Sequence, residues 1–216
     1  MKDWSNHIDL VCKRSTKMMG ILRKVCPLIH PSAHLTLYYS FLFPYLNYCN
    51  LVWAASYPNH LKKWCIIQKR FLRFISHSNR YAPSAPLFIN YSILPIHKLN
   101  IYQICLFIHK FIYRNQDLPE SFQSLFTHSF NVHSHRTRHS NNNNLSLPFS
   151  RTSHHQLSMS YRGPALWNVL PPVLRSLSSY SLFKKQLKKH LIFSWIILLL
   201  NFDYFWFIYV LCLIIF

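Results

Sequence analysis

The sequence predicts a mainly α-helical protein, organised as a helical bundle followed by an irregular segment, a short basic helix and an apolar C-terminal helix. Apolar residues recur at intervals of three and four along several stretches, which is the period of a helix that buries one face. Prolines stand where several of these stretches begin or end, as they do at helix boundaries. Of the 216 residues, 50% are hydrophobic and 17% aromatic, which suffices for one sizeable core or two small ones.

The N-terminal part contains two expected helices. Residues 5–26 predict the first, with Ser5 as its N-cap and a basic outer face. A second helix is expected to start after Ser32 and to be interrupted at Pro44, because proline lacks the backbone N–H that a helix interior uses. Residues 45–57 are aromatic and largely apolar, and their length is compatible with either a helix or a strand.

The middle of the chain carries the clearest periodicity. Residues 59–76 predict an amphipathic, strongly cationic helix, because the apolar residues trace one face and the basic residues lie largely off it. Pro83 and Pro86 indicate a linker, and Pro95 opens a further helix that is mostly core and ends near Arg114.

Beyond this helix the composition changes. Asp117 and Glu120 match the D-x-x-E capping-box pattern at the start of a short helix. Residues 127–156 are rich in His, Ser, Asn and Arg, which is typical of a loop. The predicted domains are a helical region (1–115), an irregular His/Ser/Asn-rich segment (116–160), a basic closing element (161–191) and an apolar tail (192–216).

The closing element reads "YRGPALWNVLPPVLRSLSSYSLFKKQLKKHL". We expect a turn at Gly163 and Pro164, a buried anchor at Trp167 and a break at the proline pair that follows. A short basic helix then completes the element.

The charge balance points to an anionic partner. There are 24 Lys and Arg against 5 Asp and Glu, a formal net charge of +19 that repels itself in a compact chain unless a polyanion is bound. The backbone of RNA or DNA is the leading partner, contacted without sequence specificity. The candidate phosphate-contacting residues are Lys62, Lys63, Lys69, Arg70 and Arg73, with Arg136, Arg138, Arg151, Arg162, Lys184, Lys185, Lys188 and Lys189 as secondary candidates.

Catalysis by the chain alone is not expected. Metal-dependent phosphoryl transfer needs several convergent carboxylates, and the sequence contains too few. Histidines are numerous, but residues 121–202 contain no Asp or Glu to orient them as ligands, so neither a metal nor another cofactor is predicted. The six cysteines form no C-x-x-C pair, and no small-molecule substrate is indicated.

The tail supplies the alternative hypothesis. Residues 192–216 are long enough to span a bilayer, although Asp203 lies near their middle. The basic residues 184–189 would border such a span and would also attract anionic lipid. A tail-anchored membrane protein is therefore the alternative to a nucleic-acid binder.

Several motifs, in order, resemble one protein family. Residues 37–75, "LYYSFLFPYLNYCNLVWAASYPNHLKKWCIIQKRFLRFI", are similar to a P-x-L-x-Y-x-x-x-V-W element followed by a helix with a Q-K-x-x-x-R pattern. "HRTRHS" and "LPFSRT" resemble two downstream elements, and residues 161–191 resemble a closing G-P-x-L-W-N signature. Together they resemble the post-palm, thumb and C-terminal region of reverse transcriptases from non-LTR retrotransposons (LINE-type, jockey-like elements).

The resemblance implies a thumb-like helical region that grips a template and primer duplex, in a protein family that copies RNA into DNA. The family's metal-binding aspartates and its Y/F-A-D-D motif have no counterpart in this sequence, so no catalytic residue is carried over. We therefore expect a truncated remnant of an RNA-directed DNA polymerase with nonspecific nucleic-acid binding at most. The resemblance implies a nuclear or cytoplasmic location, or a membrane location if the tail, which departs from the family, inserts.

Overall fold

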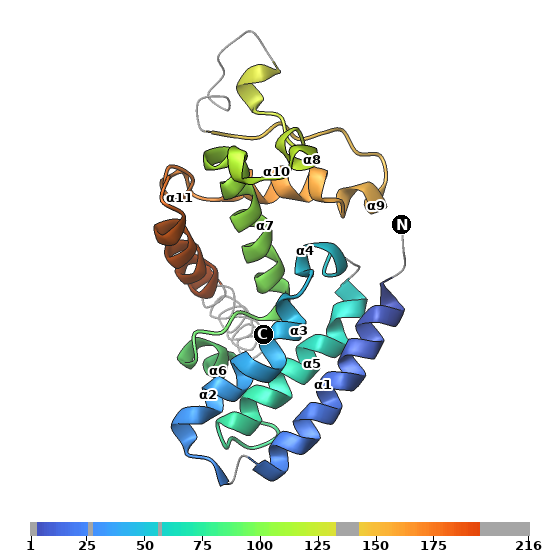
Figure 1. The fold of residues 1–216 in the computed structure, drawn as a ribbon, viewed down its shortest axis with the longest axis vertical. Helices are drawn as coiled ribbons and strands as arrows, with labels where there is room; N and C mark the ends of the chain where they lie inside the picture. The colour runs from blue at the N-terminus through green and yellow to red at the C-terminus, as the bar shows by residue number, and fades with distance from the viewer. Residues whose placement is uncertain (1–3, 26–27, 56–57, 133–142, 195–216) are drawn as a thin grey trace, which may run out of the picture.

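The fold is mainly helical, as the sequence predicts (Figure 1). The computed structural model describes residues 4–25, 28–55, 58–132 and 143–194. Within these ranges there is no β-strand, and one isolated bridge joins His128 to Leu145. The predicted apolar tail lies outside the described residues, apart from its first three positions.

Two long helices, α1 (Ser5–Val25) and α5 (Pro58–Ile75), lie side by side. Residues early in α1 contact residues early in α5, so the two helices run in the same direction. α1 turns its apolar stripe inward, burying Ile8, Met19 and Leu22. The amphipathic period expected for both helices is confirmed, because each buries one face and leaves its basic residues exposed, apart from the half-buried Arg73.

The chain between α1 and α5 is also helical, in short consecutive pieces. Pro44 does not end the second helix, contrary to the prediction: the backbone widens into a π-helical turn before Pro44 and then continues. A wider turn accommodates the proline ring and its missing N–H. Cys49 adopts a left-handed conformation (φ 48°) and separates the last two pieces, so the ambiguous stretch is helical as far as Trp53. The pieces are η2 (Pro31–Ala33), α2 (His34–Leu37), η3 (Tyr38–Leu42), α3 (Phe43–Asn47) and α4 (Asn50–Trp53).

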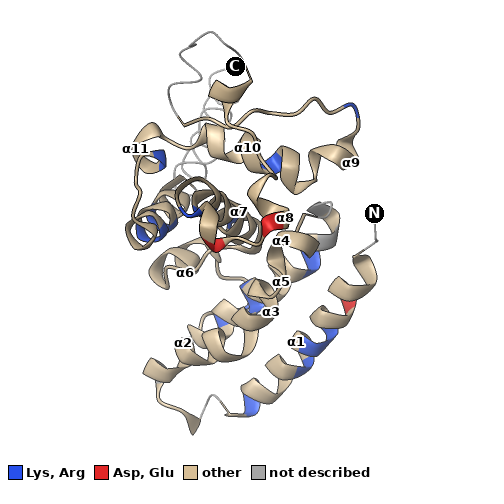
Figure 2. Cartoon of the chain, turned by 45° about the horizontal axis from the view of Figure 1, so that its top comes forward, with Lys and Arg blue, Asp and Glu red and all other residues tan. Residues whose placement is uncertain are grey.

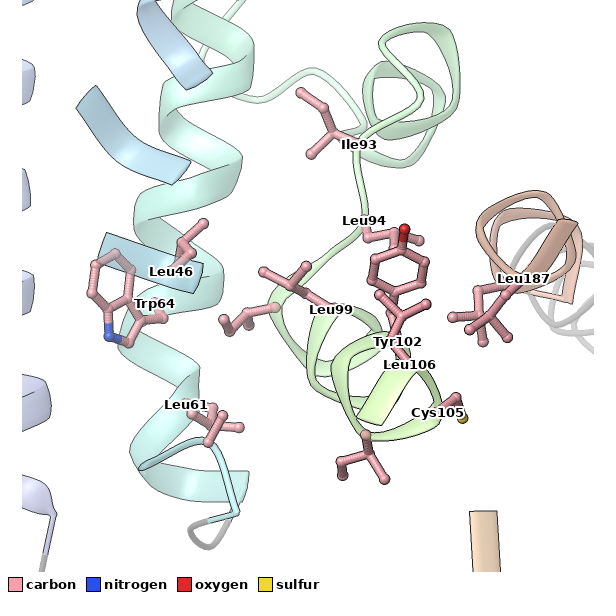
Figure 3. Packing of buried hydrophobic residues seen from close by; sticks show 14 of the residues in the cluster. Leu46, Leu61, Trp64, Ile93, Leu94, Leu99, Tyr102, Cys105, Leu106 and Leu187 are labelled. Atoms are coloured by element: carbon pink, nitrogen blue, oxygen red, sulfur yellow. The ribbon is translucent and has the colours of Figure 1, made fainter. Parts of the chain in front are cut away.

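α7 (Ile96–Tyr113) is the centre of the fold and starts directly after Pro95, as predicted. It is buried on most of its surface because other helices pack around it. α5 lies on one side, α10 (Met159–Val169) crosses its C-terminal half, and a helix at residues 180–194, called the closing helix below, runs antiparallel to it. Figure 3 shows Leu187 of the closing helix pointing toward Tyr102 and Leu106 of α7. One core therefore extends from α1 to the closing helix.

Gln68 of α5 joins three parts of this core. Its side chain is fully buried, and its Nε2 donates to the hydroxyl of Tyr38 (2.9 Å) and to the carbonyl of Leu94 (2.9 Å). Its Oε1 accepts from the backbone N–H of Ile96 (3.0 Å). This amide thereby satisfies the first N–H of α7 and fixes α7 against α5.

His109 of α7 forms a second buried polar link. Its Nε2 donates to the carbonyl of Leu177 at 2.7 Å, and its ring stacks on Phe183 of the closing helix with centroids 4.3 Å apart. Burial, the largest cause, and the charge of Arg114 lower the pKa of His109, against the opposing effect of the hydrogen bond to Leu177.

The remaining elements connect this core. The capping-box prediction is wrong, because Asp117 lies in η4 and α8 begins at Glu120 after Pro119, with no side chain capping it. Pro119 fixes the chain in an extended conformation between the two residues of the pattern. The connecting elements are α6 (Ala85–Asn90), η4 (Asn115–Asp117), α8 (Glu120–Gln123), η5 (Ser129–Asn131), α9 (Ser153–Gln156) and α11 (Pro172–Arg175).

The closing element differs from its prediction at one point. Gly163 and Pro164 lie inside helix α10 and form no turn. The glycine fits here because α10 packs closely on Phe126 and on Ile108 of α7: a Cβ at Gly163 would lie 2.9 Å from Phe126 Cε1 and 3.2 Å from Ile108 Cδ1. Trp167 is the buried anchor that was expected, and its Nε1 donates to the carbonyl of Asn143 at 3.0 Å.

Candidate nucleic-acid interface

A cationic groove runs between α1 and α5. Lys13 and Lys17 project from α1 one helical turn apart, and Lys63 and Arg70 project from α5 two turns apart. Both pairs stay on one helix face, so the parallel packing of the helices brings all four cations to the same groove. The groove has a volume of about 600 Å³, and its lining also includes Cys12, Ile66 and Ile67.

Asp9 is the one carboxylate that lines this groove. It accepts from Lys63 Nζ at 2.6 Å, in an ion pair whose side chains remain 43% and 64% exposed. The pKa of Lys63 is raised, first by this hydrogen bond and then by the charge of Asp9. Within the described residues, Lys13, Lys17 and Arg70 have no carboxylate within ion-pair distance. The groove therefore keeps a positive excess.

The positive surface continues along α1. Figure 2 shows Lys and Arg positions from the middle of this helix to its C-terminal end. Three further basic residues of α1 are exposed: Arg14, Arg23 and Lys24. The basic outer face predicted for this helix is thus adjacent to the predicted cationic helix, and the two form one surface.

The five predicted cations of α5 serve different purposes. Lys63 and Arg70 line the groove with α1. Lys62 faces the opposite side, in a depression between α5, α7 and α10 that Arg162 also lines. Burial lowers the pKa of Arg162. Arg73 is partly structural, because its Nε donates to the carbonyl of Ala82 at 2.8 Å and ties the following loop to α5.

Lys69 is exposed near the start of α7. There it is the third cause, after burial and Lys98, of a lowered pKa for His97. Lys69 lines neither the groove with α1 nor the depression between α5, α7 and α10.

The secondary candidates do not form one site. Lys184, Lys185 and Lys188 line a separate cavity against η3, α3 and α7, whereas Lys189 is exposed and lies outside its lining. Arg151 is exposed on the loop before α9. Arg136 and Arg138 lie outside the described residues.

Sequence reasoning missed two groove residues, Lys13 and Lys17. Their spacing of four residues on a helix with a basic face was an available signal. Their importance depends on the neighbouring helix, because only its position makes them part of a groove.

The described residues offer no metal site and no reactive thiol signal. Among them, no three His, Cys, Asp or Glu side chains are grouped closely enough to hold a metal ion. Burial raises the pKa of Cys12 to about 11, with a smaller contribution from Asp9, and burial raises that of Cys105 to about 12. A thiol with a raised pKa is a poor nucleophile at neutral pH.

No helix in the described part of the chain is long and apolar enough to cross a membrane. The span considered in the sequence, residues 195–216 above all, lies outside that part.

Comparisons with known proteins do not assign this chain to a family. No family model, curated protein or solved structure significantly matches this chain. The resemblance to retrotransposon reverse transcriptases therefore stays a prediction that depends on the motifs quoted above.

Proposed function

We propose that this chain binds RNA and DNA through the phosphate backbone without reading sequence, as the post-palm region of a retrotransposon reverse transcriptase. The observation that carries the binding proposal is the groove between α1 and α5, where four cations face one carboxylate. The ordered motifs in residues 37–75 and 161–191 support the proposed origin. Binding, and not polymerisation, is the proposed activity, because the family's catalytic motif has no match in these residues.

The spacing of the groove cations suits a polyanion. Lys63 and Arg70 are seven residues apart on α5, which corresponds to about 10 Å along the helix axis at about 1.5 Å per residue. Each phosphate of a nucleic-acid strand carries one negative charge, and the two side chains are far enough apart to contact different phosphates of one strand. Lys13 and Lys17 approach from the other wall.

The test is the salt dependence of binding. The full-length chain is titrated against a fluorescein-labelled 20-mer, as single strand and as duplex, and fluorescence anisotropy is recorded from 50 to 300 mM NaCl. Each lost phosphate contact lowers the slope of log K against log salt by about one. We expect the double variant Lys17→Gln/Arg70→Gln to lower the slope by about two.

A matched variant separates the groove from net charge. Arg80→Gln removes one positive charge at an exposed loop position outside the groove, and Arg70→Gln alone removes one inside it. Arg80→Gln is expected to leave the slope within about half a unit of the parent value, while Arg70→Gln lowers it by about one. An equal loss in these two single variants would show that net charge, not the groove, binds the strand. The absence of salt-dependent binding would refute the proposed function as a whole.

A further inference from the structure

A second cavity lies on the other side of the core, between the short helices after α1, the start of α7 and the closing helix. It has a volume of about 480 Å³ and none of its lining residues is acidic. Its walls come from segments far apart in the sequence, since η3 and α3 supply one wall and the closing helix the other. Cavities of this size hold small ligands or single groups of larger ones.

Aromatic rings line one side of this cavity. Tyr39 and Phe43, one turn apart, meet edge to face with centroids 5.4 Å apart, and Tyr39 keeps 38% of its surface exposed. Across the cavity stands Tyr180, at the start of the closing helix. Lys110 and Arg114 lie 5.3 and 5.9 Å from its ring centroid. Tyr39 is therefore the ring of this cavity with a large exposed surface for a planar group to contact.

Cations line the other side. Lys184 and Lys188 stand one turn apart on the closing helix, and Lys185 lies beside them. Burial lowers the pKa of Lys188, and the neighbouring charge of Lys184 lowers it further. An anion bound here would relieve the repulsion between these ammonium groups.

Between the rings and the lysines lie neutral hydrogen-bonding groups. Gln103 Nε2 donates to Asn47 Oδ1 at 2.5 Å, which leaves the Gln103 carbonyl and the Asn47 amide hydrogens for a ligand. Ser92 and Ser181 add hydroxyl groups to the lining. Donors and acceptors at the edge of an aromatic slot are what a nucleobase requires.

We propose that this cavity receives one unpaired nucleobase of a single strand, stacked on the ring of Tyr39, with the adjoining phosphates held by Lys184 and Lys188. This inference rests on the proposed function and adds a preference for single strands to it. A paired base is stacked in its duplex and exposes no free face, so a duplex cannot fill the cavity. The charge of the lining selects an anionic occupant, and the rings select one that is flat.

The test compares two single strands that carry the same phosphates. Fluorescence anisotropy measures the binding of the full-length chain to a fluorescein-labelled 20-mer of dT and to the same strand made of abasic tetrahydrofuran units, at 100 mM NaCl. Stacking of a base on an aromatic side chain strengthens binding about tenfold, so we expect about a tenfold preference for the strand with bases. Tyr39→Ala is expected to lower this ratio at least threefold.

Two controls isolate the ring. Tyr39→Phe keeps the stacking face and should keep the preference, while Tyr81→Ala removes a tyrosine that is 86% exposed and does not line the cavity. Lys184→Gln should weaken binding of both strands, and Lys189→Gln, five residues further along the helix and outside the lining, should weaken it less.

The outcomes separate this inference from the proposed function. Salt-dependent but equal binding of the two strands overturns the base cavity and leaves groove binding intact. The same result for Tyr39→Ala and Tyr81→Ala also overturns the base cavity. No salt-dependent binding of either strand overturns the proposed function and the base cavity together.

Discussion

The chain contains two glycines, and the structure predicts opposite effects for the same substitution at each. In Gly163→Ala the new Cβ would lie 2.9 Å from Phe126 Cε1 and 3.2 Å from Ile108 Cδ1, well inside the favourable carbon–carbon separation of about 3.5 to 4.0 Å. Phe126 has little room to move, because its ring packs edge to face on Phe111 with centroids 5.0 Å apart. Overpacking of this kind costs about 1 to 3 kcal/mol.

Alanine also favours a helix over glycine, by about 1 kcal/mol. At Gly163 this gain offsets part of the overpacking, so the net loss of unfolding free energy is about 0 to 2 kcal/mol. At Gly20, at an exposed position in the C-terminal third of α1, a Cβ meets nothing within 4 Å. Gly20→Ala therefore keeps the whole gain, and the protein is stabilised by about 0.5 to 1 kcal/mol.

Urea titration followed by circular dichroism at 222 nm measures both effects on the full-length chain. The two midpoints should move in opposite directions from the parent midpoint while the slopes stay equal. Stabilisation by Gly163→Ala would refute the close approach of α10 to α7. Destabilisation by Gly20→Ala would refute the exposed position of that residue on α1.

Three further predictions concern polar groups. Gln68→Met removes the hydrogen bonds of three buried partners without a large change in side-chain volume. It should lower the unfolding free energy by about 2 to 4 kcal/mol in the urea assay. The control Gln186→Met, on the exposed face of the closing helix, should change the unfolding free energy by less than about 0.5 kcal/mol. Because the folded state lowers the pKa of His109, the unfolded chain binds more protons just below pH 6.5, so stability falls as the pH decreases from about 6.5. His109→Phe should flatten that decrease in melting temperature between pH 5 and 8. An unchanged dependence of the melting temperature on pH would show that His109 is not its cause. Asp9→Asn removes the groove's carboxylate and should tighten single-strand binding roughly twofold to fivefold in 50 mM NaCl. The increase in affinity should disappear at high salt, because salt screens these charges. Weaker binding by the variant would argue against the groove as the binding site.

Helices could be predicted from the sequence where the residues that bound them and the residues within them indicate the same structure. The start of α7 after Pro95 and the amphipathic stripe of α5 follow from the residues themselves, and the structure confirms both. The prediction was wrong where a neighbouring residue changed the geometry. Pro119 moved the start of α8 away from Asp117, and a π-helical turn carried the chain through Pro44.

The candidate sites also depend on neighbouring segments that local sequence patterns do not reveal. The predicted cations of α5 are indeed exposed or half-buried, but periodicity could not divide them between the groove with α1 and the depression beside α10. Gln68 lies on the inner face of its helix, but its three hydrogen bonds depend on η3 and on the chain before α7. Tyr39 and Lys184 are separated by most of the chain, and no local pattern relates them.

The sequence by itself determined the helical class, the helix faces that are buried and the excess of positive charge, because helix period and charge are properties of nearby residues. Only the tertiary structure decided which cations share a groove, why Gly163 must lack a side chain and which rings meet the lysines of the closing helix. These features depend on the packing of segments that are distant in sequence, and close packing is decided by the shapes of all the partners together.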